Sequence, residues 1–90
     1  MMHNVLLGPG DDTLGVVELS GGAEVELSRY DMRLKLLEAG LELDVTDDKD
    51  DRKALRQDIC ALRKAIKAID KALLADGIEP FDLARDCAVN

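Results

Sequence analysis

The chain has 90 residues, with 12 lysines and arginines against 19 aspartates and glutamates, for a net charge of −7. This length corresponds to one domain, and the excess of acids argues against general affinity for nucleic acid or for an anionic membrane. Only Tyr30 and Phe81 are aromatic. Aliphatic side chains must therefore build the core, and an aromatic-lined ligand pocket is not expected.

Hydropathy and cysteine usage predict a cytoplasmic protein. No run approaches the roughly 20 apolar residues of a membrane span, and the start of the chain lacks the basic and apolar regions of a signal peptide. The two cysteines, Cys60 and Cys87, lie far apart without CxxC spacing. This pattern favours free thiols in a reducing cytosol over a disulfide.

Residues 1–28 predict a β-hairpin region, with a short strand over 4–7 and a hairpin whose turn contains Gly21 and Gly22. A three-residue loop gathers the apolar side chains on one face, whereas a two-residue loop mixes the two faces. The three-residue loop is therefore preferred, although it sets two glutamates opposite each other. The expected cross-strand pairs are Leu19 with Ala23, Val17 with Val25, Gly15 with Leu27, and Glu18 with Glu24.

Residues 29–40 fit either a strand or a helix. Every second residue from Tyr30 to Leu36 is apolar, as in a strand, whereas a helical stripe runs through Tyr30, Leu34, Leu37 and Leu41. Ser28 and Asp31 resemble a capping box, and good helix formers follow. Gly40 is a natural stop. We therefore predict a short helix over 29–40, with a strand as the alternative.

A long amphipathic helix is predicted over 47–76, after an acidic connector over 41–46. Thr46 or Asp47 is the expected cap, acids crowd the first turn, and basic residues occupy the later turns, as the helix dipole favours. Gly77 and Pro80 end the helix. Residues 77–90 then form a C-terminal tail.

The long helix carries an apolar stripe that the other predicted elements are too small to cover. A helix of this length spans about 45 Å, and the predicted short helix covers a third of it. A second stripe of alanines runs beside the first. The large residues are therefore predicted to form an association interface, with a homodimer favoured over an ordinary core face or a groove for a different partner. They alternate at four- and three-residue spacing: Leu55, Ile59, Leu62, Ile66, Ile69 and Leu73.

No motif indicates catalysis, a cofactor or a metal. A calcium loop beginning at Asp44 fails because the position that needs glycine holds Lys49 and the position that needs a bidentate glutamate holds Leu55. The glycine-rich segments lack nucleotide-binding spacing, and His3 is the only histidine. We therefore predict a protein that is not an enzyme and that holds no cofactor.

Two charged surfaces are candidate partner sites, although solvation explains both more simply. The acids at the start of the long helix would contact a basic surface of a larger complex or imitate a phosphate backbone. They are Asp47, Asp48, Asp50 and Asp51. The basic face of the helix would bind nucleic acid, which is the weaker alternative for so acidic a protein. It comprises Arg56, Arg63, Lys64 and Lys67.

Together these features predict an α+β fold in one domain, residues 1–90. A small N-terminal antiparallel β-hairpin sheet, a short helix and one long amphipathic helix form a helical hairpin or a self-associating bundle. The predicted function is non-enzymatic protein binding by stoichiometric association. The protein would act as an assembly scaffold or as a small acidic inhibitor of a larger complex, including a complex that handles nucleic acid.

Overall fold

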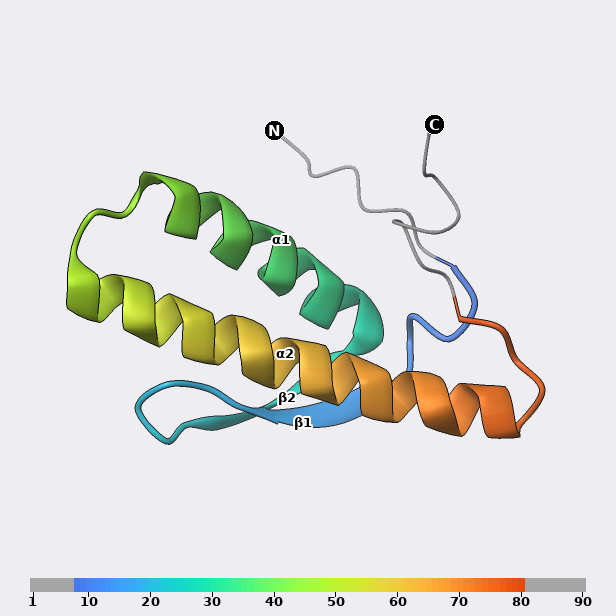
Figure 1. Ribbon diagram of the computed structural model, residues 1–90. Helices are drawn as coiled ribbons and strands as arrows, with labels where there is room; N and C mark the ends of the chain where they lie inside the picture. The colour runs from blue at the N-terminus through green and yellow to red at the C-terminus, as the bar shows by residue number, and fades with distance from the viewer. Residues whose placement is uncertain (1–7, 81–90) are drawn as a thin grey trace, which may run out of the picture.

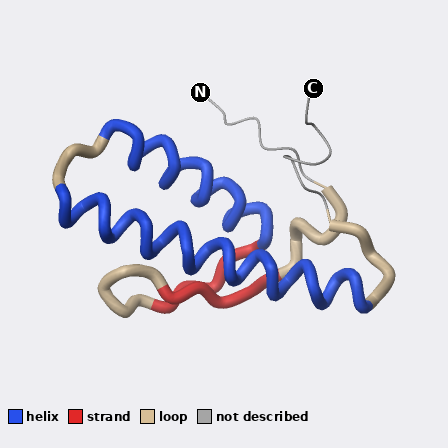
Figure 2. The backbone as a smooth tube through the Cα atoms, viewed as in Figure 1, coloured by secondary structure: helices blue, strands red, loops and turns tan. Residues whose placement is uncertain are grey.

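The computed structural model describes residues 8–80 and shows a two-stranded antiparallel sheet beside two helices (Figure 1). Strands β1 (Leu14–Glu18) and β2 (Glu24–Ser28) form a hairpin, and helices α1 (Arg29–Val45) and α2 (Lys49–Ala75) form a second, helical hairpin. Helix α2 packs against both α1 and β1, and α1 meets the sheet at its amino-terminal end, where it follows β2 (Figure 2). The predicted α+β fold with a helical hairpin is confirmed, whereas the predicted strand over residues 4–7 and most of the tail lie outside the described residues.

The hairpin has the register that the side-chain pattern predicts. Val17 pairs with Val25, Gly15 pairs with Leu27, and the two glutamates Glu18 and Glu24 face each other. The Leu19 amide donates to the Ala23 carbonyl oxygen at 2.8 Å, which closes the three-residue loop. The burial of one face decided this register, because a one-residue slip would turn the apolar side chains toward water.

Helix α1 is longer than predicted, and the connector is correspondingly shorter. The predicted helix ended at Gly40 with a connector over 41–46, whereas α1 continues to Val45 and only residues 46–48 separate the helices. Gly40 does not adopt the positive φ with which glycine ends a helix. The end of α1 is instead capped from α2, because an Arg52 Nη donates to the carbonyl oxygens of Leu43 and Thr46 at 2.9 and 3.0 Å.

Helix α2 begins later than predicted, at Lys49 rather than residue 47, and its cap is Asp48 rather than Thr46 or Asp47. One Asp48 carboxylate oxygen accepts the amide hydrogens of Asp50 and Asp51, at 2.8 and 3.3 Å. Asp48 thus satisfies donors that have no partner inside the helix.

The C-terminal end of α2 confirms the role predicted for Gly77. This glycine has a φ of 80°, and the Ile78 amide donates to the Leu73 carbonyl oxygen at 2.9 Å. The Gly77 amide donates to the Leu74 carbonyl oxygen at 3.0 Å, and the two bonds make a Schellman motif. A residue with a Cβ is strained at this φ, so local sequence ends α2.

The core lies where the two hairpins meet. Its buried side chains come from β1, α1 and α2, and the strand approaches the helices closely at Gly15. A Cβ at Gly15 would lie 3.0 Å from Met32 Cε and 3.1 Å from Ile69 Cδ1, so this position needs the smallest residue. The buried members of the core are Val17, Met32, Leu62, Ile69 and Leu73.

We predict that Gly40→Ala stabilises the protein by about 0.5–1 kcal/mol, because alanine loses less backbone entropy than glycine in a helix. No atom lies within 4 Å of a Cβ built at Gly40, so the methyl group fits. The measurement is the free energy of unfolding in urea. The control is Gly77→Ala, which should destabilise the protein because Gly77 has a positive φ. Equal effects of the two substitutions would contradict the assignment of Gly40 to a helix interior.

Candidate functional site

The apolar stripe of α2 faces the chain's own core. Leu62, Ile69 and Leu73 are buried, and Leu55, Ile59 and Ile66 are half-buried. Within one copy these six side chains are thus at least partly covered, and their role as an association interface stays a prediction. Helix α1 continues through Gly40 for five residues beyond its predicted end, and the hairpin covers part of the remainder. Association through Leu62, Ile69 and Leu73 would require the core to open.

Helix α1 carries a second apolar stripe that points away from the core. Its inward side includes buried Met32 and Ala39 and half-buried Leu36. The opposite side, called here the outer α1 face, recurs at helical spacing of three and four residues. It comprises Tyr30, Leu34, Leu37, Leu41 and Val45. The helical pattern noted in the sequence is therefore this outward stripe, and the inward stripe was not recognised.

The outer α1 face is exposed over most of its length. Leu37, Leu41 and Val45 are 42%, 57% and 79% exposed, and Tyr30 and Leu34 are half-buried. Isolated exposed aliphatic residues are common on proteins, but a continuous row of them indicates a binding surface. The row is bordered by exposed acids, and Lys35 is the exposed base among them. These acids are Asp31, Glu38, Glu42 and Asp44.

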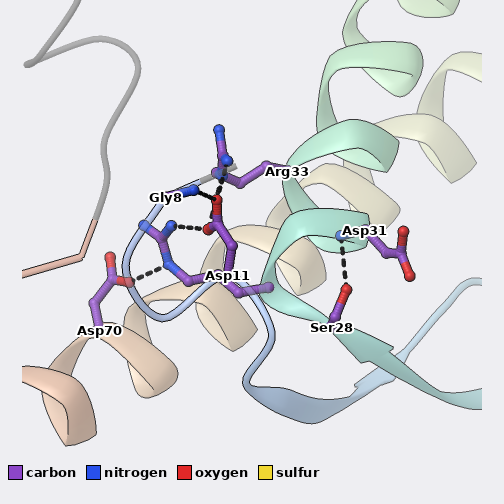
Figure 3. Close-up of polar contacts among 7 residues, drawn as sticks. Gly8, Asp11, Ser28, Asp31, Arg33 and Asp70 are labelled. Carbon is purple, nitrogen blue, oxygen red and sulfur yellow. Dashed lines mark hydrogen bonds and ion pairs between the residues drawn. The ribbon is translucent and has the colours of Figure 1, made fainter. Parts of the chain in front are cut away.

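A buried ion network holds α1 in this orientation. Asp11, which lies in the loop before β1, and Arg29, the first residue of α1, are 0% and 2% exposed. An Arg29 Nη donates to Asp11 Oδ1 at 2.7 Å, and Arg29 Nε donates to Asp70 Oδ1 of α2 at 2.7 Å. Arg33 adds a second guanidinium to the Asp11 carboxylate. Figure 3 shows Asp11 and Asp70 drawn toward this cluster from separate segments.

The network also organises the backbone around Asp11. The Gly8 amide donates to Asp11 Oδ2 at 2.7 Å (Figure 3), and the Tyr30 amide donates to the Asp11 carbonyl oxygen at 2.9 Å. Ser28 caps the same end of α1 as predicted, because its Oγ accepts the Asp31 amide hydrogen at 3.1 Å. Asp11 therefore connects the start of α1 to the loop before β1 through hydrogen bonds of both its side chain and its backbone.

The charges of this network are suited to structure rather than to proton transfer. Burial alone raises the pKa of Asp11, but hydrogen bonds from Arg33, the Gly8 amide and Arg29 outweigh it and hold this pKa below 3.8. Burial likewise opposes the charge of Arg29, and Asp70 and Asp11 outweigh it, so the pKa of Arg29 is raised. Asp11 therefore stays ionised near neutral pH and is not a general acid.

The predicted acidic surface gathers at the turn between the helices. Asp47, Asp48, Asp50 and Asp51 are all exposed. Asp48 is used as the cap, and Asp50 and Asp51 lie in the first turn of α2, where the helix dipole favours acids. The cluster adjoins Val45 in the chain, so it borders one end of the outer α1 face.

The predicted basic face is a continuous exposed strip on α2, opposite the core. Within residues 8–80, none of its members forms an ion pair with another described residue. The exposed residues Lys53 and Lys71 extend the strip at its two ends. The predicted members, all exposed, are Arg56, Arg63, Lys64 and Lys67.

A shallow groove of about 480 Å³ lies between β1 and α2, on the side of the small alanine residues. Val16, the large aliphatic residue exposed in it, is 61% exposed. The groove thus offers less continuous apolar surface than the outer α1 face. Its lining residues are Val16, Val17, Glu18, Gln57, Cys60, Ala61, Lys64 and Ala65.

Residues 8–80 contain neither a cluster of metal ligands nor a membrane-spanning helix. No group of three or more histidine, cysteine, aspartate or glutamate side chains is placed there to hold a metal ion. In the same part of the chain, no helix combines the length and the apolar character that crossing a membrane requires. Comparison with models of known protein families, with curated proteins and with solved structures gives no match to this chain.

We predict that Asp11→Asn destabilises the protein by about 3 kcal/mol at neutral pH, because it removes the buried carboxylate that Arg29 and Arg33 share and leaves Arg29 with Asp70 alone. A carboxyl group with a lowered pKa contributes stability above its unfolded pKa of about 3.9 and loses it as the pH falls. The difference between the variant and the unaltered protein should therefore shrink below about pH 4.

Urea denaturation at neutral and acidic pH measures both effects. Asp12→Asn is the matched control, because Asp12 is exposed and adjacent in sequence, and it should change stability by less than about 0.5 kcal/mol. A stability difference for Asp11→Asn that is small, or independent of pH, would contradict the role of the buried network.

Proposed function

We propose that this protein is a non-enzymatic binding module that acts by stoichiometric association through the outer α1 face. The observation that carries the proposal is the row of Leu37, Leu41 and Val45, exposed on one side of a helix whose other side is built into the core. Each large aliphatic residue left in water forgoes part of the roughly 1.5–3 kcal/mol that burial provides. A partner that covers the row recovers this free energy.

The charges around the outer α1 face specify the chemistry of the partner. Exposed acids border the row along α1, and the acidic turn at residues 46–51 extends this border beyond Val45. An apolar helix or groove rimmed by lysine and arginine is complementary to such a surface. A scaffold and a stoichiometric inhibitor are both compatible with this surface, because each works by occupying a partner. The free, exposed thiol of Cys60 supports a reducing compartment such as the cytosol.

The first test is a titration of the labelled protein with a synthetic amphipathic helical peptide of leucine and lysine, followed by amide chemical shifts. We expect shifts centred on Leu37, Leu41 and Val45, because this surface matches the peptide in both polarity and charge. A scrambled peptide of the same composition has no apolar face, and it should bind at least about tenfold more weakly.

Two variants make the titration specific. Leu41→Asp should abolish peptide binding, whereas Leu74→Asp, a leucine on α2 of matched exposure, should leave it unchanged. Leu41 and Leu74 are 57% and 59% exposed, so the two substitutions perturb folding similarly. Equal binding by both variants, or shifts spread over the whole acidic surface, would contradict the proposal.

A second candidate function is nucleic-acid binding through the basic strip on α2, which the exposure of its cations favours. Our first proposal predicts that filter binding at low and moderate salt detects no affinity that depends steeply on salt, because the net charge of −7 repels a polyanion. The second candidate would be established instead by an affinity for nucleic acid that falls steeply with salt. This affinity should be lost when four residues are changed to glutamine: Arg56, Arg63, Lys64 and Lys67.

A further inference from the structure

We propose that the free edge of β1 binds an extended segment of a different protein, which adds a third, antiparallel strand to the sheet. The segment presents β-branched apolar side chains toward α2 and a lysine or arginine at each end. Main-chain hydrogen bonds supply the affinity in strand addition of this kind, and alternate side chains supply the specificity. This inference goes beyond the proposed function, because it concerns a second surface and does not depend on the outer α1 face.

The backbone of β1 offers hydrogen-bonding groups on the side away from β2. The Leu19 amide donates to the Ala23 carbonyl oxygen at 2.8 Å, so Leu19 and every second residue before it bond toward β2. The residues between them have the opposite bonding direction. The amide and carbonyl groups of Val16 and Glu18 therefore face the free edge, and they bond to no other described residue.

Helix α2 determines where this free edge ends. Ser20 is the next residue whose amide faces the edge, and this amide donates to Asp58 Oδ1 of α2 at 2.7 Å. Ser20 Oγ donates to Asp58 Oδ2 at 3.3 Å. Because Asp58 already occupies the edge at Ser20, the part that is open to another strand is β1 itself, Leu14–Glu18.

The open edge borders the groove between β1 and α2, two elements that lie alongside each other (Figure 1). Val16, Val17 and Glu18 line the groove from β1, and no residue of β2 lines it, which places it on the unpaired side of β1. The α2 wall includes Ala61 and Ala65, whose short side chains leave room for a chain beside β1. A second hollow of about 390 Å³ continues from Glu18 along the hairpin loop.

Strand β1 lacks the features that usually protect an edge strand from pairing. Its sequence contains neither proline nor lysine, and Leu14 and Val16 are 59% and 61% exposed. Strand β2, by contrast, carries the exposed charges of Glu24 and Glu26. An open apolar edge is a template for another strand, so β1 is the edge of this sheet that favours strand addition.

Charges at the two ends of the edge specify the ends of the bound segment. Asp12 is exposed just before β1, and Glu18 ends β1 and faces Glu24 across the hairpin. Like charges that are directly opposite each other are destabilising, and a cation beside Glu18 relieves this repulsion. An apolar segment with a basic residue at each end is therefore complementary to the edge in charge.

Charge also disfavours a second copy as the occupant. If β1 of one copy paired with β1 of another, the two α2 helices would lie on the same face of the joined sheet. Lys64, which lines the groove, would then meet the basic strip of the other α2. This contact between like charges opposes association, so the bound segment belongs to a different protein.

The first experiment titrates the labelled full chain with a peptide of sequence Lys-Val-Thr-Val-Thr-Val-Lys, blocked at both ends and called here the strand peptide. We expect amide shifts centred on Val16 and Glu18, with a dissociation constant of roughly 0.1–1 mM, because the contact is smaller than a standard interface. Hydrogen exchange of these two amides should slow on binding, because they then bond to the peptide. The Val17 amide, which bonds to β2, is the reference and should change little.

Backbone methylation separates strand pairing from unspecific apolar contact. In the antiparallel arrangement the threonine amides of the strand peptide face the β1 edge, whereas the valine amides face away from it. N-methylation of both threonines should weaken binding by at least about tenfold, because it removes two donors. N-methylation of the first and last valines adds the same number of methyl groups and should leave the dissociation constant nearly unchanged.

A pair of proline variants tests the protein side of the contact. Val16 and Glu26 lie directly opposite each other in the hairpin, and the amide of each faces the free edge of its own strand, where proline is tolerated. Val16→Pro removes a donor from the groove and should weaken binding of the strand peptide by at least about tenfold. Glu26→Pro is the matched control and should change the dissociation constant by less than about threefold.

Circular dichroism verifies that both proline variants fold. If Val16→Pro does not fold, Glu18→Lys replaces it, because this exposed position tests the same edge through its charge. Glu18→Lys should weaken binding of the strand peptide by about three- to tenfold. It should strengthen binding of a peptide in which glutamates replace the two lysines.

The outcomes separate this inference from the proposed function. Leu41→Asp alters the outer α1 face and should leave binding of the strand peptide unchanged. If millimolar strand peptide causes no shifts at Val16 and Glu18, or if the two methylated peptides bind equally, strand addition is overturned and the helical peptide still tests the outer α1 face. Weakening by valine methylation alone overturns the antiparallel direction. A dimer of the unaltered protein that Val16→Pro abolishes makes a second copy the occupant and overturns the assignment to a different protein.

Discussion

The orientation of α1 depends on Arg29. This side chain bridges Asp11 of the loop before β1 and Asp70 of α2, and it is almost completely buried while doing so. A buried charge is expensive unless its partners surround it, so the three segments that supply those partners are held together. Since Arg29 is the first residue of α1, the network determines which side of the helix enters the core. Met32 and Ala39 then face inward, and the outer α1 face is left on the surface.

This orientation gives the two helices different roles. Helix α2 has one apolar side and one basic side, so its side chains by themselves decide which side is buried. Helix α1 has apolar residues on opposite sides, and the other elements within residues 8–80 cover only one of them. Within residues 8–80, the uncovered side is a row of exposed aliphatic side chains that the core does not use.

Charge is distributed so that the two ends of α1 differ. The acidic turn caps α2 through Asp48 and lies at the carboxyl end of α1, where the helix dipole is already negative. This arrangement stabilises the start of α2 but leaves the end of α1 electrostatically unfavourable. Arg52 compensates by donating to the last carbonyl oxygens of α1, and the remaining negative potential suits a basic or dipolar partner.

Several elements were predictable because their causes are local. The hairpin register follows from the alternation of residues 15–27, the amino-terminal cap of α1 follows from Ser28, and the end of α2 follows from Gly77. Each depends on the side-chain period or on the backbone preference of one residue, which the neighbouring sequence carries in full. The helix over residues 29–40 was also predictable from local sequence. The apolar spacing that indicated it belongs to the side of α1 that faces away from the core.

The candidate site depended on distant contacts instead. No local pattern marks Arg29 as buried, because its partners Asp11 and Asp70 lie 18 and 41 residues away. Nor does local sequence show that Arg52 caps α1 beyond Gly40. The longer α1 covers more of the α2 stripe than the predicted helix would. The sequence by itself determined the hairpin and its register, the start of α1, the end of α2 and the apolar side of α2. Only the tertiary structure decided which apolar side of α1 is buried, because that choice depends on where charges from three separate segments meet.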